Sequence, residues 1–308
     1  MPKASLAHLA VVIAGHGSRD HEGVQEFLAF ADLFRRHQAQ RTVEVGFLEF
    51  AQPTVEEAVD RCVAQGAQQI VVLPGVLMSA RHAKDDLAAE VQLVRRKYPQ
   101  ALVHLGHPLH LHPKLLQLCR QRIEEAEAVS PMKVDRQNTC LVVVGRGSSD
   151  PDANGDMCKL ARIVWEGMQF GWSHIAYSGI TTPRVRDTLD RTVRMGFRRV
   201  LVFPCFLFTG RLVKEVYALC AEIQASYPNV DILPAGYLGT DALLLDVFLD
   251  RAQEAVNGSA HMNCSLCQYR VPIIGFEDKV GTPQMAHHTH VRGGRTEPPH
   301  EIVCSLST

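Results

Sequence analysis

Short aliphatic runs alternate with longer amphipathic segments along the first third of the chain. The runs have the length and composition of buried strands, and the longer segments carry apolar residues at helical spacing. The expected strands are Val11–Ala14, Thr42–Leu48, Gln69–Leu73 and Ala101–Leu105, and the expected helices are Glu22–Gln38, Thr54–Gln65 and Lys84–Lys97. This alternation predicts an α/β fold in which a small parallel sheet is flanked by helices on both faces.

The pattern occurs twice. Residues Val11–Asp20, VVIAGHGSRD, are matched by Leu141–Asp150, LVVVGRGSSD, at an offset of 130 residues. The same offset pairs Pro53 with Pro183, Gly66 with Gly196, Pro74 with Pro204 and Gly106 with Gly236. A fixed offset of this kind indicates tandem duplication of one α/β unit. We therefore expect an N-terminal lobe over residues 1–130, a second lobe over 131–257, and an irregular tail over 258–308 that lacks an amphipathic pattern.

Composition narrows the functional classes. The chain has 308 residues, of which 46% are hydrophobic and 21% charged, an ordinary composition for a soluble protein. A formal net charge of −1 provides no basic field, so no nucleic-acid partner is expected. No segment approaches the roughly 18 apolar residues of a membrane span, and no signal-peptide pattern is recognisable. The nine cysteines, an odd number, are mostly scattered and suit a reducing compartment. These features predict a cytoplasmic protein with no membrane partner.

Three polar side chains follow successive strands of the first lobe. His16 lies in the turn GHGS after the first strand, Glu49 follows the second, and His82 lies in the loop after the third. Because parallel strands end at one edge of a sheet, we expect these side chains to converge there. Two imidazoles and a carboxylate suit a transition metal such as Co²⁺, Fe²⁺ or Ni²⁺.

The second lobe is an internal control for this site. At the same offset it carries Arg146, Gly179 and Leu212, so all three candidate ligands are missing together. Independent loop residues need not vanish as a set, and the difference therefore favours one functional site, in the first lobe. A phosphohistidine phosphatase, which uses a histidine in an RHG turn, is disfavoured because no arginine precedes His16.

Three motifs carry a family resemblance: GHGSRD around His16, FLEFAQPTVEEA around Glu49, and LPGVLMSARHAKDDL around His82. Together they resemble the class II tetrapyrrole chelatases, specifically the sirohydrochlorin chelatases of the cobalt branch, in the long form of the CbiX family that fuses two chelatase-like lobes. The resemblance covers roughly residues 8–255. It implies that His16 and His82 bind the incoming metal and face the macrocycle, and that Glu49 assists with protons.

The same resemblance implies ATP-independent insertion of Co²⁺, as the substrate metal, into sirohydrochlorin in cobalamin (corrin) biosynthesis. No GxxxxGK[ST] phosphate loop is present, in keeping with a reaction that does not use ATP. The carboxylates of this substrate are expected to meet guanidinium groups in or near the rim loops. The expected substrate-binding residues are Ser18, Arg19, Arg81, Arg146, Arg184 and Arg211. The alternatives are a sirohydrochlorin ferrochelatase for sirohaem and a non-catalytic metal-delivery protein.

The tail carries metal-ligand residue types of its own. They are the CxxC pair Cys264 and Cys267, then His287, His288 and His290, and finally Cys304. Two thiolates cannot complete an iron–sulfur site without partners. The resemblance to the tail of long cobalt-branch chelatases implies an iron–sulfur cluster on the CxxC pair, which a dimer through these cysteines would complete. A redox dithiol is the competing interpretation of the pair, and the histidines are a candidate metal-gathering patch.

Overall fold

The computed structural model describes residues 9–260, 269 and 271–282. The chain divides into two compact units, one formed by residues up to Leu109 together with those from Leu245 onward, the other by residues 110–244. Each unit contains a four-stranded sheet whose neighbouring strands are all parallel. The α/β class predicted from the sequence is confirmed.

In the first unit the strand order is β2-β1-β3-β4. The strands are β1 Leu9–Gly15, β2 Val43–Phe47, β3 Gln69–Pro74 and β4 Leu102–Leu105. In the register, Ile13 of β1 lies beside Val45 on one side and Leu73 on the other. Every residue of β1 is buried, as its unbroken apolar run requires in a sheet covered on both faces. The connection from β1 leads to β2 on one side, and the connection from β3 leads to β4 on the other, so a ligand crevice is expected beyond the carboxyl ends of β1 and β3.

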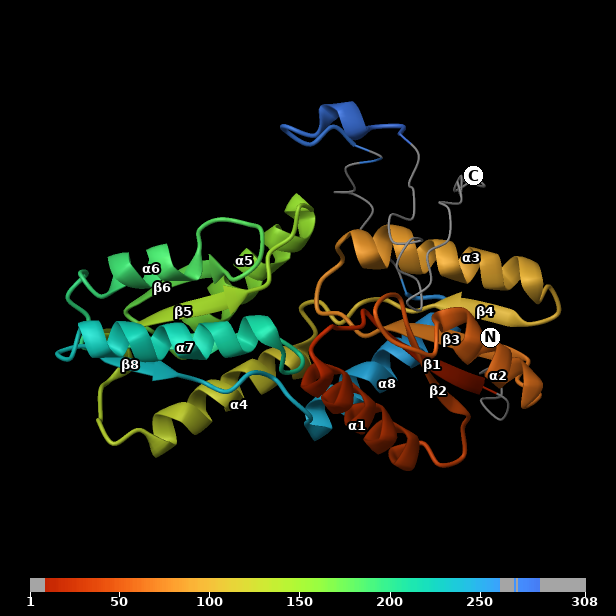
Figure 1. Cartoon of the computed structure of the whole chain (residues 1–308), viewed down its shortest axis with the longest axis horizontal. Helices are drawn as coiled ribbons and strands as arrows, with labels where there is room; N and C mark the ends of the chain where they lie inside the picture. The colour runs from red at the N-terminus through yellow and green to blue at the C-terminus, as the bar shows by residue number, and fades with distance from the viewer. Residues whose placement is uncertain (1–8, 261–268, 270, 283–308) are drawn as a thin grey trace. The chain divides into compact units, whose positions relative to one another are not determined.

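Helices cover both faces of this sheet. They are α1 His21–His37, α2 Val55–Ala64, α3 Leu87–Lys97 and α8 Ala242–Val256. Helices α2 and α3 share one core cluster with Val12 and Val72 of the sheet. On α8, Phe248 contacts Phe30 and Phe34 of α1, with ring centroids 4.9 and 6.3 Å apart. Figure 1 shows α3 on one side of the sheet and α1 and α8 on the other.

The helix predicted over Lys84–Lys97 differs from the observed one at its start. A π-helical turn, His82–Asp86, precedes α3, and the N–H of Leu87 donates to the carbonyl of His82 five residues back. The sequence pattern cannot show this turn, because it changes which backbone groups pair while leaving the later apolar spacing intact. The turn brings His82 into the beginning of the helical segment.

In the second unit the strand order is β6-β5-β7-β8, the same arrangement as in the first. Its strands are β5 Thr139–Gly145, β6 Trp172–Tyr177, β7 Arg199–Pro204 and β8 Asp231–Pro234. Its helices are α4 Pro113–Val129, α5 Pro151–Met168, α6 Val185–Thr192 and α7 Arg211–Ser226, with a short 3₁₀ turn at Arg136–Asn138. The equal strand order agrees with the duplication inferred from the sequence.

The compact units do not follow the predicted lobe boundaries. Helix α4 precedes residue 130, yet it packs with α5 and β8 and belongs to the second unit. Helix α8, from Leu245 onward, belongs to the first unit. Each unit therefore contains the last helix of the other repeat. An amphipathic sequence marks which face of a helix is buried, but nothing in it says which sheet that face will cover.

No helix among the described residues is long and apolar enough to cross a membrane. The described part of the tail contains only a short 3₁₀ turn, Glu277–Lys279, as regular structure. The tail residues Cys264, Cys267, His287, His288, His290 and Cys304 lie outside the described residues. The iron–sulfur cluster, the metal-gathering patch and the dimer through the tail cysteines stay predictions.

Candidate metal centre

Two loops of the first unit are joined backbone to backbone beyond the ends of β1 and β2. The N–H of Glu49 donates to the carbonyl of His16 at 2.9 Å, and the N–H of Leu48 donates to the carbonyl of Gly15 at 3.0 Å. Gly17 has a φ of +88°, and a Cβ added there would lie 1.7 Å from the Glu49 carbonyl oxygen. The glycine is therefore required both by its conformation and by the closeness of the second loop. This contact holds His16 and Glu49 side by side.

The three predicted ligands meet at this edge of the sheet. Their ligand atoms all lie within 4.8 Å of one another. The two Nε2 atoms of His16 and His82 are 2.9 Å apart, and His16 Nε2 is 4.0 Å from Oε2 of Glu49. The imidazole rings are nearly perpendicular, at 88°. Glu49 is buried, at 2% exposure, whereas both histidine side chains are partly exposed, so that a metal ion can reach the imidazoles from solvent.

The hydrogen-bond partners of the two Nδ1 atoms determine whether each Nε2 atom carries a hydrogen or a lone pair. Nδ1 of His16 lies 2.8 Å from the carbonyl oxygen of Gly17, and Nδ1 of His82 lies 3.0 Å from Oδ2 of Asp86. A carbonyl and a carboxylate only accept, so each Nδ1 carries a hydrogen. Two neutral rings would then direct two Nε2 lone pairs at each other across 2.9 Å. A proton or a metal cation shared by the two Nε2 atoms would remove that repulsion, so the three residues form a candidate cation site.

Buried carboxylates surround the His82 side of the site. Asp86 and Asp85 are both nearly inaccessible to solvent. Asp85 Oδ2 lies 3.6 Å from Nε of Arg81 and accepts a hydrogen bond of 3.1 Å from the hydroxyl of Tyr269. Their negative charge favours a cation at the three-residue site.

The second unit keeps the backbone of this site without its ligands. The N–H of Gly179 donates to the carbonyl of Arg146 at 2.7 Å, which reproduces the joint between Glu49 and His16. Arg146 is exposed, and at the remaining position Leu212 stands where the first unit has His82. The predicted asymmetry between the repeats is thus a difference of side chains on one backbone plan.

The predicted substrate-binding residues of the first unit lie close to the three ligands in sequence. The Ser18 hydroxyl accepts the N–H of Asp20 at 3.0 Å, which places it in the local turn that starts α1. The Arg19 guanidinium lies over the ring of Phe50, 4.8 Å from its centroid. Arg81 directly precedes His82 and pairs with Asp85. These three side chains stay predicted contacts of the substrate.

In the second unit, the predicted substrate-binding arginines are all exposed. Arg184 is the residue before α6, and Arg211 begins α7 with its Nη1 3.2 Å from Oε1 of Glu215. Exposed guanidinium groups near the carboxyl ends of strands are available to anionic ligands, and their role stays a prediction.

Sequence reasoning missed two residues beside the ligands. Phe50 follows Glu49, has an unusual φ of +54° for a non-glycine residue, and is 38% exposed. The signal was an aromatic residue in a polar loop, matched at the same offset by Ile180, which is 72% exposed. Asp86 accepts from His82, and the signal was a carboxylate four residues after a candidate ligand.

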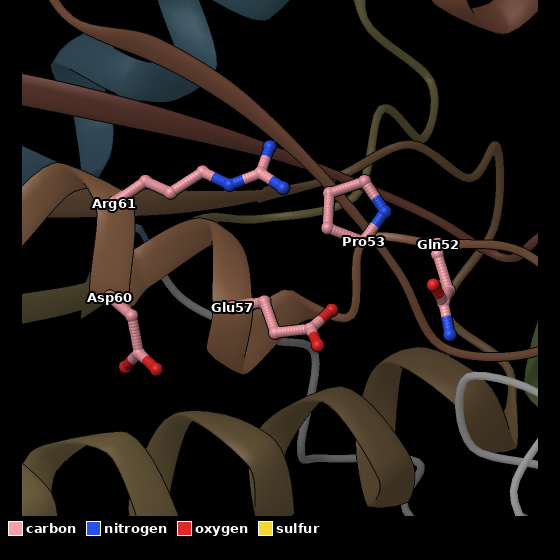
Figure 2. A pocket seen from close by; sticks show the side chains of 5 residues that line it. All are labelled: Gln52, Pro53, Glu57, Asp60 and Arg61. Carbon is pink, nitrogen blue, oxygen red and sulfur yellow. The ribbon is translucent and has the colours of Figure 1, made fainter.

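A cavity of about 500 Å³ lies elsewhere on the unit, lined by Gln52, Pro53, Glu57, Asp60 and Arg61 (Figure 2). Two of its acidic side chains make hydrogen bonds within the unit. Glu57 and Thr54 bond each other's backbone N–H at the start of α2, and Asp60 accepts from Lys97 and from the Tyr98 hydroxyl. No candidate ligand lines it, so the metal centre and not this cavity is the candidate site.

Comparison with known proteins decides the family. A sequence model of the CbiX family matches residues 10–126 and 140–255. This chain belongs to the CbiX family. The resemblance inferred from the motifs is confirmed, and the family model matches this CbiX chain twice.

Relatives of this CbiX chain carry both cobalt and iron in their names. A sirohydrochlorin cobaltochelatase of Priestia megaterium is 34% identical over 87% of this chain and 87% of its own length. A sirohydrochlorin ferrochelatase of the same organism is 33% identical over 75% of this chain and 84% of its own length. Among solved structures, SirB from Bacillus subtilis with Fe³⁺ aligns with a TM-score of 0.71 at 29% identity, covering 82% of this chain and 96% of that one.

Proposed function

We propose that this protein is a sirohydrochlorin chelatase that inserts a divalent metal, Co²⁺, into sirohydrochlorin in cobalamin biosynthesis without ATP. The observation that carries the proposal is the pair of Nε2 atoms 2.9 Å apart, each on a ring whose Nδ1 is already a donor. Such a pair is built to receive a cation. The names of the curated relatives support the tetrapyrrole as the second substrate.

Insertion of a divalent ion replaces the two pyrrole N–H protons of the macrocycle. His16 and His82 hold the ion through Nε2 while it exchanges its bound water for pyrrole nitrogens. Glu49 accepts a departing proton, because its carboxylate lies 4.0 Å from His16 Nε2 and so beside the position where the macrocycle nitrogens must approach the ion. The two protons pass from Glu49 to solvent one after the other, and the carboxylate returns to its starting state each time.

Recognition of the macrocycle requires an apolar face and cationic groups. Phe50 supplies an exposed ring next to Glu49, and the guanidinium of Arg19 lies over that ring. We propose that the Phe50 ring contacts the tetrapyrrole plane while Arg19 and Arg81 bind its carboxylates. Arg146, Arg184 and Arg211 are likewise proposed to bind carboxylates of the macrocycle.

Cobalt is proposed over iron because the cobaltochelatase relative matches more of this chain, 87% against 75% for the ferrochelatase relative. Nitrogen and carboxylate ligands accept Co²⁺, Fe²⁺ and Ni²⁺ alike, so the donor set itself does not choose. A sirohydrochlorin ferrochelatase for sirohaem is therefore the second candidate. Steady-state rates with each ion decide between the two.

The decisive test is turnover of metal-free sirohydrochlorin, followed by its change in visible absorbance. His16→Ala and His82→Ala are expected to lower kcat by at least about a hundredfold, and Glu49→Gln is expected to lower kcat more than the affinity for Co²⁺. Arg146→Ala, at the position matching His16, should raise KM with kcat retained. A wild-type protein that binds Co²⁺ but turns over nothing is a delivery protein, and an equal loss in Arg146→Ala and His16→Ala refutes the single-site assignment.

A further inference from the structure

Asp86 is the last residue of the π-helical turn and stands at the start of α3. Its backbone angles are helical, φ −66° and ψ −52°, so Asp86 lies within the continuous helical segment and its side chain does not cap α3. Its Oδ2 instead lies 3.0 Å from Nδ1 of His82, four residues earlier, with the carboxylate 5% exposed and the imidazole 17% exposed.

We propose that Asp86 is a positioning residue for the metal, and that its carboxylate holds His82 with Nε2 directed at the ion and strengthens that nitrogen as a ligand. The inference rests on the proposed function and adds a residue to it. Carboxylates behind metal-bound histidines fix the ring orientation and the tautomer, and their loss typically weakens metal binding by about 10- to 100-fold.

The neighbouring carboxylate has other partners. Asp85 pairs with Arg81 and accepts a hydrogen bond from the Tyr269 hydroxyl. The other ligand is supported differently, since Nδ1 of His16 meets the carbonyl of Gly17, an uncharged acceptor. Of the two Nδ1 atoms, only that of His82 is supported by a carboxylate, and removal of this charge should weaken metal binding.

The chain provides a matched control. In the second unit, His110 Nδ1 lies 2.9 Å from Oδ2 of Asp156, with the imidazole 11% and the carboxylate 5% exposed. Distance, burial and chemistry resemble those of the His82–Asp86 pair, but no candidate metal ligand belongs to the second unit. Asp156→Asn thus measures what loss of a buried carboxylate–histidine pair does to the protein when no metal is involved.

The experiment titrates full-length protein with Co²⁺ in the absence of sirohydrochlorin, following the visible absorption of the bound ion. Asp86→Ala should weaken Co²⁺ binding by about 10- to 100-fold and alter the absorption spectrum, and Asp86→Asn, which keeps an acceptor without the charge, should fall between it and wild type. Asp156→Asn should bind Co²⁺ within twofold of wild type. In turnover, Asp86→Ala should change KM for sirohydrochlorin less than twofold.

Affinity and spectrum unchanged in folded Asp86→Ala would overturn the proposal. If that variant does not fold, Asp86→Asn decides in the same way, with a change under twofold counting against the positioning role. Equal weakening in Asp156→Asn and Asp86→Asn would assign the effect to stability alone and also overturn it. The His82→Ala variant separates failure of the Asp86 proposal from failure of the proposed function. If His82→Ala binds Co²⁺ as tightly as wild type, the metal site itself is refuted.

Discussion

Replacement of Gly17 by alanine is the sharpest test of how the metal centre is held together. The added Cβ would lie 1.7 Å from the carbonyl oxygen of Glu49 and 2.8 Å from its carbonyl carbon. Both are backbone atoms, which cannot rotate away as the end of a long side chain could. One of the two loops must therefore move by more than about 1 Å to reach an ordinary contact distance.

The cost can be worked from the contacts that this movement breaks. An alanine at a φ of +88° costs about 1 kcal/mol. Separation of the loops also strains the hydrogen bonds from Glu49 to His16 and from Leu48 to Gly15, worth about 1 kcal/mol each. The total is about 3 kcal/mol of stability. Metal ligands tolerate only about 0.2 Å of displacement, so displacement of the His16 loop should lower Co²⁺ affinity at least tenfold, and displacement of Glu49 should lower kcat.

Replacement of Gly66 by alanine separates the cost of a positive φ from the cost of the close contact with Glu49. Its φ is +83°, close to that of Gly17, but no atom lies within 4 Å of an added Cβ. Gly66→Ala should therefore cost only the conformational term, about 1 kcal/mol, and bind Co²⁺ as wild type does. Unfolding in urea followed by circular dichroism measures the stabilities, and absorption titration measures the affinities. If the two variants lose the same stability and both bind Co²⁺ normally, the close approach at Gly17 does not hold the site.

Three further predictions follow from the described contacts. Phe50→Ala should raise KM for sirohydrochlorin about tenfold with Co²⁺ affinity unchanged, because an exposed ring that contacts the macrocycle is worth about 1–2 kcal/mol; an unchanged KM counts against that contact. Burial raises the pKa of Asp156, but hydrogen bonds from His110 and Lys159 outweigh it and bring the pKa from 3.8 to about 2. The ionised carboxylate thus adds about 2 kcal/mol to the free energy of unfolding of the second unit above pH 4, and this contribution is lost as the pH falls toward 2. The chain's two tryptophans both lie in that unit, so their fluorescence reports its unfolding. The acid-induced loss of stability should appear in wild type and not in Asp156→Asn. A chain ending at Asn257 should keep its insertion activity and lose any iron–sulfur absorbance, and an inactive folded truncation would contradict this.

The parts of the fold that the sequence predicted well are those where burial dictates residue type at every position. Strand β1 is buried along its whole length, so its aliphatic run was visible without any alternation. Helix α2 begins where the capping pair Thr54 and Glu57 places it. The three candidate ligands were singled out because one repeat lacks all of them, and the structure brings them together.

The parts that could not be predicted depend on backbone hydrogen bonding, backbone conformation and helix placement, which the pattern of apolar and polar side chains does not determine. The π-helical turn at His82–Asp86 shifts backbone pairing by one residue and leaves no mark on apolar spacing. The left-handed conformation of Phe50 is imposed by its neighbours and not by its own preference. The exchange of α4 and α8 depends on which of two sheets offers the better complement, and both helices carry an ordinary apolar face.

The exchange of α4 and α8 between the units determines when, during synthesis, each unit has all of its residues. The ligands His16, Glu49 and His82 all leave the ribosome early, but the sheet that carries them stays open along α1 until Phe248 of α8 arrives against Phe30 and Phe34. The second unit, by contrast, has received α4 before its first strand appears, and is whole once residue 244 is added. The unit whose residues are synthesised first can therefore be completed only after all residues of the second unit have been made.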